Sequence, residues 1–216
     1  MQGSSAVTPQ IAEYLDGLVH EPPHLAAVGA WIEENEEPIH ISPAQGAALR
    51  ALVAATGARR VLEIGTHVGY SALWIAEALA PAGGRLVSLE VDPRRAQTAR
   101  THLAASPWGA AVTVVTCDAR DWLATSDDEF DLVFLDAEKI LYLDLFRAAW
   151  DRLRTGGSLV ADNTLHKGRV VAPVKDSTRA IAALNVLATS GSVGHGTVLP
   201  LGDGLTLVVK TADTLP

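Results

Sequence analysis

The sequence predicts a single α/β domain built on a doubly wound, mostly parallel sheet. Short apolar runs alternate with helical patterns through the middle of the chain, which is typical of parallel strands joined by crossover helices. A glycine turn follows the first of these runs, where such sheets place their ligand loop. The length of 216 residues, with 48% hydrophobic residues, suits one domain with a sizeable core.

Helical patterns occupy the N-terminal quarter of the chain. Amphipathic helices are expected over 7–20 and 24–36, separated by a Pro-Pro pair. A third helix begins after Ser42, which can cap it, with Pro43 in the first turn. Gly57 provides a left-handed end for this helix. We therefore expect a helical segment before the first strand.

Regular alternation follows this segment. Strands are expected over 60–64, 85–90, 112–116, 131–135 and 157–161. Helices are expected over 70–80, 93–105, 119–125, 141–153 and 176–189. The tail differs, because segments 194–200 and 205–210 flank the turn sequence Gly202-Asp203-Gly204 and predict an antiparallel hairpin.

Composition excludes several classes of partner. The net charge is −8 and no basic run occurs, which argues against nucleic acid and anionic membranes. Cys117 is the only cysteine, so no intramolecular disulfide can form, and a cytoplasmic location is expected. The first nine residues lack the pattern of a signal peptide, and no apolar run is long enough to span a bilayer.

The segment 60–71 reads as a strand, a glycine turn and the start of a helix. Its spacing is E-x-G-x-x-x-G, with Glu63, Gly65 and Gly69 at the defined positions. A dinucleotide fingerprint needs a glycine where this chain has His67, because the backbone must approach the pyrophosphate. The pattern instead suits a ligand without phosphate, such as S-adenosylmethionine (SAM). The alternative is a turn that needs two glycines for steric reasons only.

Acidic residues follow the second and third predicted strands. Glu90 ends the second strand, where a carboxylate can accept hydrogen bonds from both ribose hydroxyls of a bound nucleoside. Asp118 and Ala119 follow the third strand and are expected near an adenine ring. The alternatives are a solvated carboxylate at Glu90 and a helix N-cap at Asp118.

Oxygen-bearing side chains follow the fourth and fifth predicted strands. Asp136 comes after one strand, and Asp162 and Asn163 come after the other. Neighbouring strands lie about 4.8 Å apart, so three oxygen ligands can converge at this edge. Two carboxylates and an amide suit Mg²⁺ or Ca²⁺ better than zinc. The alternatives are a helix cap at Asp136 and a turn at Asp162-Asn163.

Lys139 lies one helical turn after Asp136. Beside a dication and in a dry cleft, the charged form of a lysine is disfavoured, which makes Lys139 a candidate general base. The alternative is a salt bridge from Lys139 to Asp136 or Glu138.

Four motifs together resemble the cation-dependent O-methyltransferases of the caffeoyl-CoA and catechol type, including their bacterial members. They are Val61 to Ser71, Asp136-Ala137-Glu138-Lys139, Asp162-Asn163-Thr164-Leu165 and Leu201-Gly202-Asp203-Gly204. The resemblance covers about Glu21 to Lys210. It implies a class I methyltransferase fold, with a seven-stranded sheet and an antiparallel C-terminal hairpin, and methyl transfer from SAM to one hydroxyl of a vicinal aromatic diol.

The resemblance also implies roles for individual residues. The SAM contacts are expected from Ile41, Glu63, Gly65, Thr66, Ser71, Glu90, Asp118, Ala119 and Asp136. Asp136, Asp162 and Asn163 are expected to bind a divalent cation, Mg²⁺ first and Mn²⁺ or Ca²⁺ as alternatives, with Lys139 as the catalytic base. Residues 1–58 would form an acceptor lid or dimer contacts on the 59–216 core, and a homodimer is expected.

The chain departs from the family pattern around the acceptor. Ile140-Leu141 follow the lysine where plant members commonly have acidic and amide residues, and His166-Lys167-Gly168 stand where the family often reads Trp-Asn-Gly. These departures favour a free catechol, or a small antibiotic or pigment precursor, over a coenzyme A thioester.

Two other functions compete with methyl transfer. A nucleotide-dependent oxidoreductase could use a similar sheet, but His67 in the glycine loop counts against it. A non-catalytic SAM-binding protein would be free to lose the polar residues that follow the fourth and fifth strands. Their presence in this chain counts against that alternative: Asp136, Lys139, Asp162 and Asn163.

Overall fold

A computed structural model describes residues 8–37 and 39–211, and its centre is a seven-stranded sheet. The strands are β1 (Arg60–Ile64), β2 (Arg85–Glu90), β3 (Val112–Thr116), β4 (Phe130–Leu135), β5 (Leu153–Ala161), β6 (Gly194–Leu199) and β7 (Leu205–Lys210). Their order is β3-β2-β1-β4-β5-β7-β6. The first five strands run parallel, and β7 pairs antiparallel with both β5 and β6. The predicted fold class, including the C-terminal hairpin, is confirmed.

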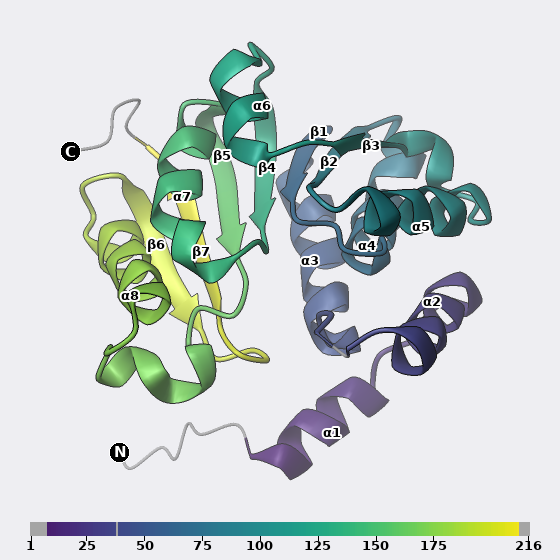
Figure 1. Cartoon of the computed structure of the whole chain (residues 1–216), viewed down its shortest axis with the longest axis horizontal. Helices are drawn as coiled ribbons and strands as arrows, with labels where there is room; N and C mark the ends of the chain where they lie inside the picture. The colour runs from purple at the N-terminus through teal and green to yellow at the C-terminus, as the bar shows by residue number, and fades with distance from the viewer. Residues whose placement is uncertain (1–7, 38, 212–216) are drawn as a thin grey trace.

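Helices cover both faces of the sheet (Figure 1). They are α1 (Pro9–Gly17), α2 (Pro23–Asn35), α3 (Pro43–Thr56), α4 (Tyr70–Leu79), α5 (Pro93–Ala104), α6 (Ala119–Thr125), α7 (Tyr142–Trp150) and α8 (Asp176–Thr189). Short 3₁₀ segments are η1 (Ala80–Ala82), η2 (Gly109–Ala111), η3 (Lys139–Leu141) and η4 (His166–Val171).

The core consists of two apolar clusters, one on each face of the sheet. Along β4, Leu132 and Phe134 belong to the cluster under α2, α3 and α4, whereas Val133 and Leu135 belong to the cluster under α7 and α8. This division follows from the alternation of side chains along a strand. Because both faces are covered, the central strands are almost continuously apolar.

Capping residues define several helix ends as the sequence predicts. Ser42 Oγ accepts a hydrogen bond from the backbone of Gln45, whose side-chain oxygen accepts one from the Ser42 backbone, and this capping box starts α3. Gly57 ends α3 in the left-handed conformation. Asp92 caps α5 through the backbone N–H groups of its first turn.

The sequence prediction was wrong at the junction of α7 and β5. The expected helix over 141–153 ends at Trp150, and the strand begins at Leu153 instead of residue 157. Leu153 pairs with Phe130 beside a register irregularity, so tertiary pairing extends the strand back through Gly156 and Gly157. The first helix is also shorter than expected, and residue 7 lies outside the described residues.

The N-terminal helices lie beside the edge of the sheet where the parallel strands end (Figure 1). Asp16 on α1 accepts a hydrogen bond from the backbone of Ala44 at 2.9 Å, and the Tyr70 hydroxyl at the start of α4 donates to Glu21. These contacts fix the N-terminal segment close to the start of α3 and to the end of the loop that follows β1. Among the described helices, none combines the length and apolar character needed to cross a membrane.

Candidate active site

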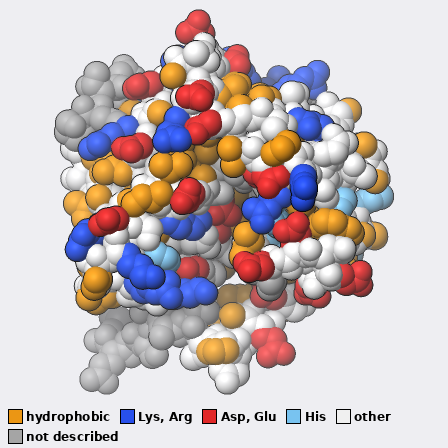
Figure 2. Space-filling view, viewed as in Figure 1, with side chains coloured by type: hydrophobic (Ala, Val, Ile, Leu, Met, Phe, Trp, Pro, Cys, Tyr) orange, Lys and Arg blue, Asp and Glu red, His pale blue; other side chains and the backbone are white. Residues whose placement is uncertain are grey.

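A cavity of about 1070 Å³ opens at the carboxyl edge of the parallel strands. Most of the predicted site residues line it, namely Ile41, Gly65, Thr66, Ser71, Glu90, Asp118, Ala119, Asp136, Lys139 and Asn163. Figure 2 shows the hollow in the middle of the face, with acidic and basic side chains around it. Two predicted residues, Glu63 and Asp162, are buried against the cavity instead of lining it.

The glycine loop approaches the end of β4 very closely. Gly65 has a φ of 94°, and a Cβ atom there would lie 2.0 Å from the carbonyl oxygen of Asp136. A side chain at this position would therefore displace the loop that carries Asp136. Gly69, also at a φ of 94°, precedes α4 in the left-handed conformation. Both glycines are thus required by the local backbone.

Glu90 anchors the same loop to the end of β2. One oxygen of its carboxylate accepts from the backbone N–H of His67 at 2.8 Å, and the other accepts from Asp92 at 2.9 Å. Glu90 is buried but lines the cavity, and each of its two oxygens can accept a further hydrogen bond. The residue therefore shapes the loop and lines the site at once.

Glu63 lies beneath the loop, and no part of it is exposed. The hydroxyls of Ser71 and Ser88 donate to its two oxygens, each at 2.5 Å. Burial raises the pKa of Glu63 to about 7, against the lowering effect of these hydrogen bonds. Glu63 thus holds Ser71 at the cavity wall, and its expected contact with the methionine part of SAM stays a prediction.

Asp118 is the N-cap of α6, which confirms the alternative interpretation of this residue. Its side chain accepts from the backbone of Arg120 at 2.8 Å and from the Arg120 guanidinium at 2.6 Å. These bonds hold the pKa of Asp118 below its usual value. Asp118 and Ala119 still form part of the cavity wall, as the sequence predicts.

Lys139 lies at the centre of a polar cluster that follows β4. Its ammonium donates to Asp136 Oδ1 at 2.7 Å and to the hydroxyl of Tyr142 at 2.6 Å. Tyr142 is fully buried and donates in turn to the carbonyl oxygen of Asp162 at 2.9 Å. The salt bridge expected as the alternative for Lys139 is therefore present, and the lysine also faces the cavity.

Asp162 is held from the N-terminal segment. The side-chain nitrogen of Gln45 donates to Asp162 Oδ1 at 2.6 Å, and both side chains are buried. Burial, followed by the negative charge of Asp136, raises the pKa of Asp162 to about 7. Asp136 and Asp162 follow paired residues of adjacent strands, because Leu135 pairs with Ala161 and its carbonyl accepts from the Asp162 backbone at 3.0 Å.

The loop after β5 has an unusual backbone. The backbone φ values of Asn163, His166 and Lys167 are 54°, 49° and 54°. They lie in the left-handed region, which residues other than glycine rarely adopt. Asp203, in the turn of the C-terminal hairpin, fixes this loop. Its carboxylate accepts from the backbone of Lys167 at 2.5 Å, and its carbonyl accepts from Leu165 at 2.8 Å.

Sequence reasoning missed Gln45, Tyr142 and Asp203 as parts of the site. Gln45 and Tyr142 carried no signal in the sequence, because each lies in the first turn of a helix where its residue type is ordinary. Asp203 stood within a recognised motif without an assigned role. All three act through contacts between distant parts of the chain.

Comparison with known proteins gives a match to the O-methyltransferase family over residues 21–211. The chain belongs to this family. It is 39% identical over 186 residues to a catechol O-methyltransferase of Mycobacterium tuberculosis, covering 85% of this chain and 84% of the relative. A catechol O-methyltransferase of Niastella koreensis is 37% identical over 151 residues, which is 68% of each chain.

Solved structures support the assignment of this O-methyltransferase. The Streptomyces achromogenes O-methyltransferase involved in tomaymycin synthesis, crystallised with SAM, has a TM-score of 0.85 and 31% identity and covers 94% of this chain and 96% of its own. A Bacillus cereus O-methyltransferase, crystallised with SAH, has a TM-score of 0.83 and 31% identity, covering 93% and 97%.

Proposed function

We propose that this O-methyltransferase transfers the methyl group of SAM to one hydroxyl of a vicinal aromatic diol, with a divalent cation bound at the site. The observation that carries the proposal is the cluster of Asp136, Lys139, Asp162 and Asn163 at the ends of β4 and β5, beside the glycine loop. The two catechol O-methyltransferases among the relatives support the choice of acceptor.

The proposed position of SAM follows the glycine loop. The methionine part would lie near Gly65, Thr66 and Ser71, with the ribose on Glu90 and the adenine near Ala119. Two observations support this position. The glycine spacing suits a ligand without phosphate, and structural neighbours were crystallised with SAM or SAH. SAM supplies an electrophilic methyl carbon on a sulfonium sulfur, so the chain has to orient the acceptor oxygen opposite to that sulfur.

The oxygen donors fit a hard cation. All side-chain hydrogen bonds to Asp136 within the described part of the chain reach Oδ1, which leaves Oδ2 for a ligand. Among the described residues, no three His, Cys, Asp or Glu side chains form a metal cluster, and the donor set here is two carboxylates and the Asn163 amide. When bound, Mg²⁺ or a similar ion would act as a Lewis acid that lowers the pKa of the diol.

Lys139 is the proposed base. Its ammonium lies between Asp136 and Tyr142 and faces the cavity, so a neutral lysine at this place could accept the proton of the reacting hydroxyl. Tyr142 would keep the amine in position through its bond to the Asp162 carbonyl. The oxyanion would then attack the methyl carbon as the carbon–sulfur bond breaks, which releases SAH, and the orientation of the two reactants can contribute roughly 7–11 kcal/mol.

The decisive experiment is a turnover assay on simple catechols with SAM. We expect methylation with Mg²⁺ or Mn²⁺, no turnover after chelation with EDTA, and recovery on addition of the metal. Asp162→Ala should lose metal affinity and turnover, whereas Asp151→Ala, at an exposed turn, should retain both. Full activity in a metal-free sample would contradict the metal site, and SAM binding without turnover of any catechol would favour a non-catalytic protein.

A further inference from the structure

The cationic side chains that line the cavity fall into two groups. Arg95, Arg120 and Lys139 each have an acidic partner, namely Glu36 at 3.4 Å, Asp118 at 2.6 Å and Asp136 at 2.7 Å. Lys167 and Arg169 also line the cavity, but neither side chain has an ion pair with any residue that the structure describes. In a chain with a net charge of −8, two unpaired cations beside one site stand out.

Both cations belong to the acceptor end of the cavity. Lys167 and Arg169 lie on η4, four and six residues after Asn163 at the end of β5, whereas the glycine loop follows β1, two strands away in the sheet. His166, the residue before Lys167, lines the same cavity.

The backbone of η4 is held in place for this arrangement. Lys167, at a φ of 54°, occupies a left-handed backbone conformation that a lysine rarely adopts. The Asp203 carboxylate accepts a hydrogen bond from the Lys167 backbone, and no ion pair between Asp203 and the Lys167 ammonium occurs among the described residues. Hydrogen bonds to Asp203 thus hold the backbone of the segment that carries the two cations.

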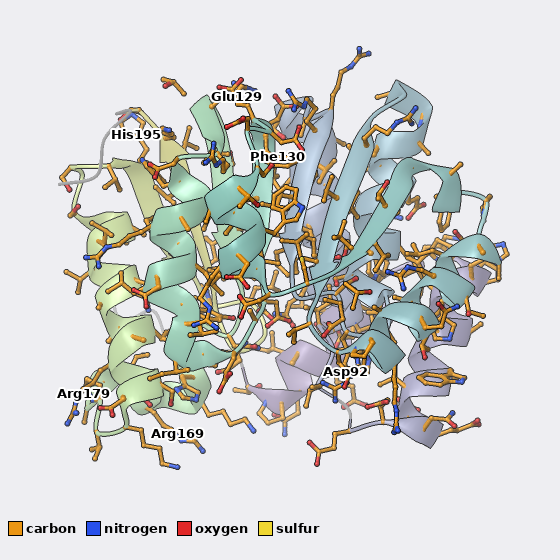
Figure 3. All side chains as sticks on the ribbon, turned by 45° about the horizontal axis from the view of Figure 1, so that its top comes forward. Asp92, Glu129, Phe130, Arg169, Arg179 and His195 are labelled. Atoms are coloured by element: carbon orange, nitrogen blue, oxygen red, sulfur yellow. The ribbon has the colours of Figure 1, made fainter. Side chains whose placement is uncertain are left out.

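The surface views agree with this description. Figure 2 shows Lys and Arg side chains gathered below and to the left of the hollow, over the region where η4 lies in Figure 1. In Figure 3, Arg169 lies in the lower part of the view, as does Asp92 after the end of β2. Arg179, labelled near Arg169, differs because it pairs with Asp176 at 2.8 Å.

We propose that the acceptor is an aromatic diol that carries a carboxylate, and that Lys167 and Arg169 bind this carboxylate while the diol lies at Asp136, Asp162 and Asn163. This inference rests on the proposed function and adds the charge of the substrate. Two donors with separate side chains can contact both oxygens of a carboxylate, whereas a cationic diol would be repelled.

The test compares acceptors that differ only in a group insulated from the ring. Dihydroxyphenylpropionate, its amide and dihydroxyphenylethylamine have similar hydroxyl groups but carry a negative, a zero and a positive charge. We expect kcat/KM to be about ten-fold higher for the propionate than for the amide. The reason is that the carboxylate would form one exposed ion pair with each of the two cations, and each such pair contributes a few-fold. The amine should be the poorest acceptor, and added NaCl should reduce the preference.

Variants connect the preference to the two side chains. The Lys167→Gln/Arg169→Gln double variant should lower kcat/KM for the propionate to the value for the amide, through KM, and leave the amide unaffected. Arg179→Gln makes the same change at a paired arginine and should keep the preference. Calorimetric titration of the propionate into enzyme with SAH and Mg²⁺ gives the same comparison without turnover.

The possible results separate the two proposals. Equal kcat/KM for propionate and amide, or a preference that survives in the double variant, would overturn this inference and leave diol methylation intact. A preference for the coenzyme A thioester that the double variant abolishes would assign the cations to phosphates and overturn the carboxylate. If no diol is methylated, the proposed function fails. An equal Kd of the propionate for the wild type and the double variant would then overturn this inference as well.

Discussion

The side chain of Gln45 donates a 2.6 Å hydrogen bond to Oδ1 of Asp162, although the two residues are 117 positions apart. The bond joins the first turn of α3 to the end of β5 inside the molecule. Gln45 also packs against the C-terminal hairpin, because a Cβ atom at Gly202 would lie 2.3 Å from its amide carbon. One glutamine therefore connects the N-terminal helices, a proposed metal ligand and the hairpin turn.

Replacing this glutamine should weaken metal binding. Gln45→Leu keeps the volume of the side chain but removes the donor that orients the Asp162 carboxylate. Loss of such a supporting hydrogen bond typically reduces metal affinity by about 10–100-fold. We expect this change in the Kd for Mg²⁺ by calorimetry, with little change for SAM. Gln97→Leu, at an exposed site on α5, is the matched control, and an unaltered Mg²⁺ affinity in Gln45→Leu would refute the role.

Removing the lysine should slow the chemical step. Lys139→Ala should lower kcat by about 10²–10⁴-fold if the amine is the general base, while SAM affinity barely changes. The loss should shrink at high pH and with acidic catechols, because these ionise without help. The structure also pairs Lys139 with Asp136, so a structural role is the competing view.

A series of catechols with graded pKa separates these views of Lys139. A defect in kcat that decreases as the catechol becomes more acidic supports the base. A uniform defect, accompanied by weaker Mg²⁺ binding or a lower melting temperature, would instead show that the lysine only holds Asp136.

Glu90→Gln should reduce the affinity for SAM much more than it reduces kcat. The carboxylate accepts from two backbone N–H groups, those of His67 and Asp92, and an amide nitrogen would face one of them as a second donor. Hydrogen bonds to a charged group contribute about 1.5–3 kcal/mol each, so we expect a rise in the SAM Kd of at least ten-fold. Ribose contacts are equal in the ground and transition states, so kcat at saturating SAM should be nearly unchanged.

A matched control for Glu90 is available on the opposite edge of the molecule. Glu129→Gln makes the same substitution at an exposed residue, which Figure 3 places far from Asp92. SAM titration of both variants is sufficient. A SAM Kd for Glu90→Gln equal to that of the Glu129 variant would show that Glu90 does not contact the ligand.

Buried Glu63 should make the stability of the protein fall as the pH rises. Its pKa is about 7 in the folded protein against 4.5 for an ordinary glutamate, so between these values the folded state holds a proton that the unfolded state has lost. The stability contribution is complete below pH 4.5 and is lost as the pH rises toward 7. One pKa unit corresponds to about 1.4 kcal/mol, so the total change is about 3 kcal/mol.

Glu63→Gln isolates this effect, because glutamine does not titrate and can still bond with Ser71 and Ser88. Urea unfolding from pH 4 to pH 8 should show the variant gaining stability relative to the wild type up to about pH 7, followed by a plateau. A difference that stays constant across this range would mean that Glu63 ionises normally in the folded protein.

The sequence alone determined the sheet, the ligand loop and the ends of β4 and β5. These features are local, since the glycines at 65 and 69 and the polar residues at 136, 162 and 163 follow short apolar runs, and parallel strands necessarily end at one edge. Tertiary structure decided how the side chains meet. It placed Glu63 beneath the loop, extended β5 back to Leu153, and brought Gln45 and Asp203 to the site. No pattern in the sequence could predict these contacts, because each depends on the packing of segments that are distant along the chain.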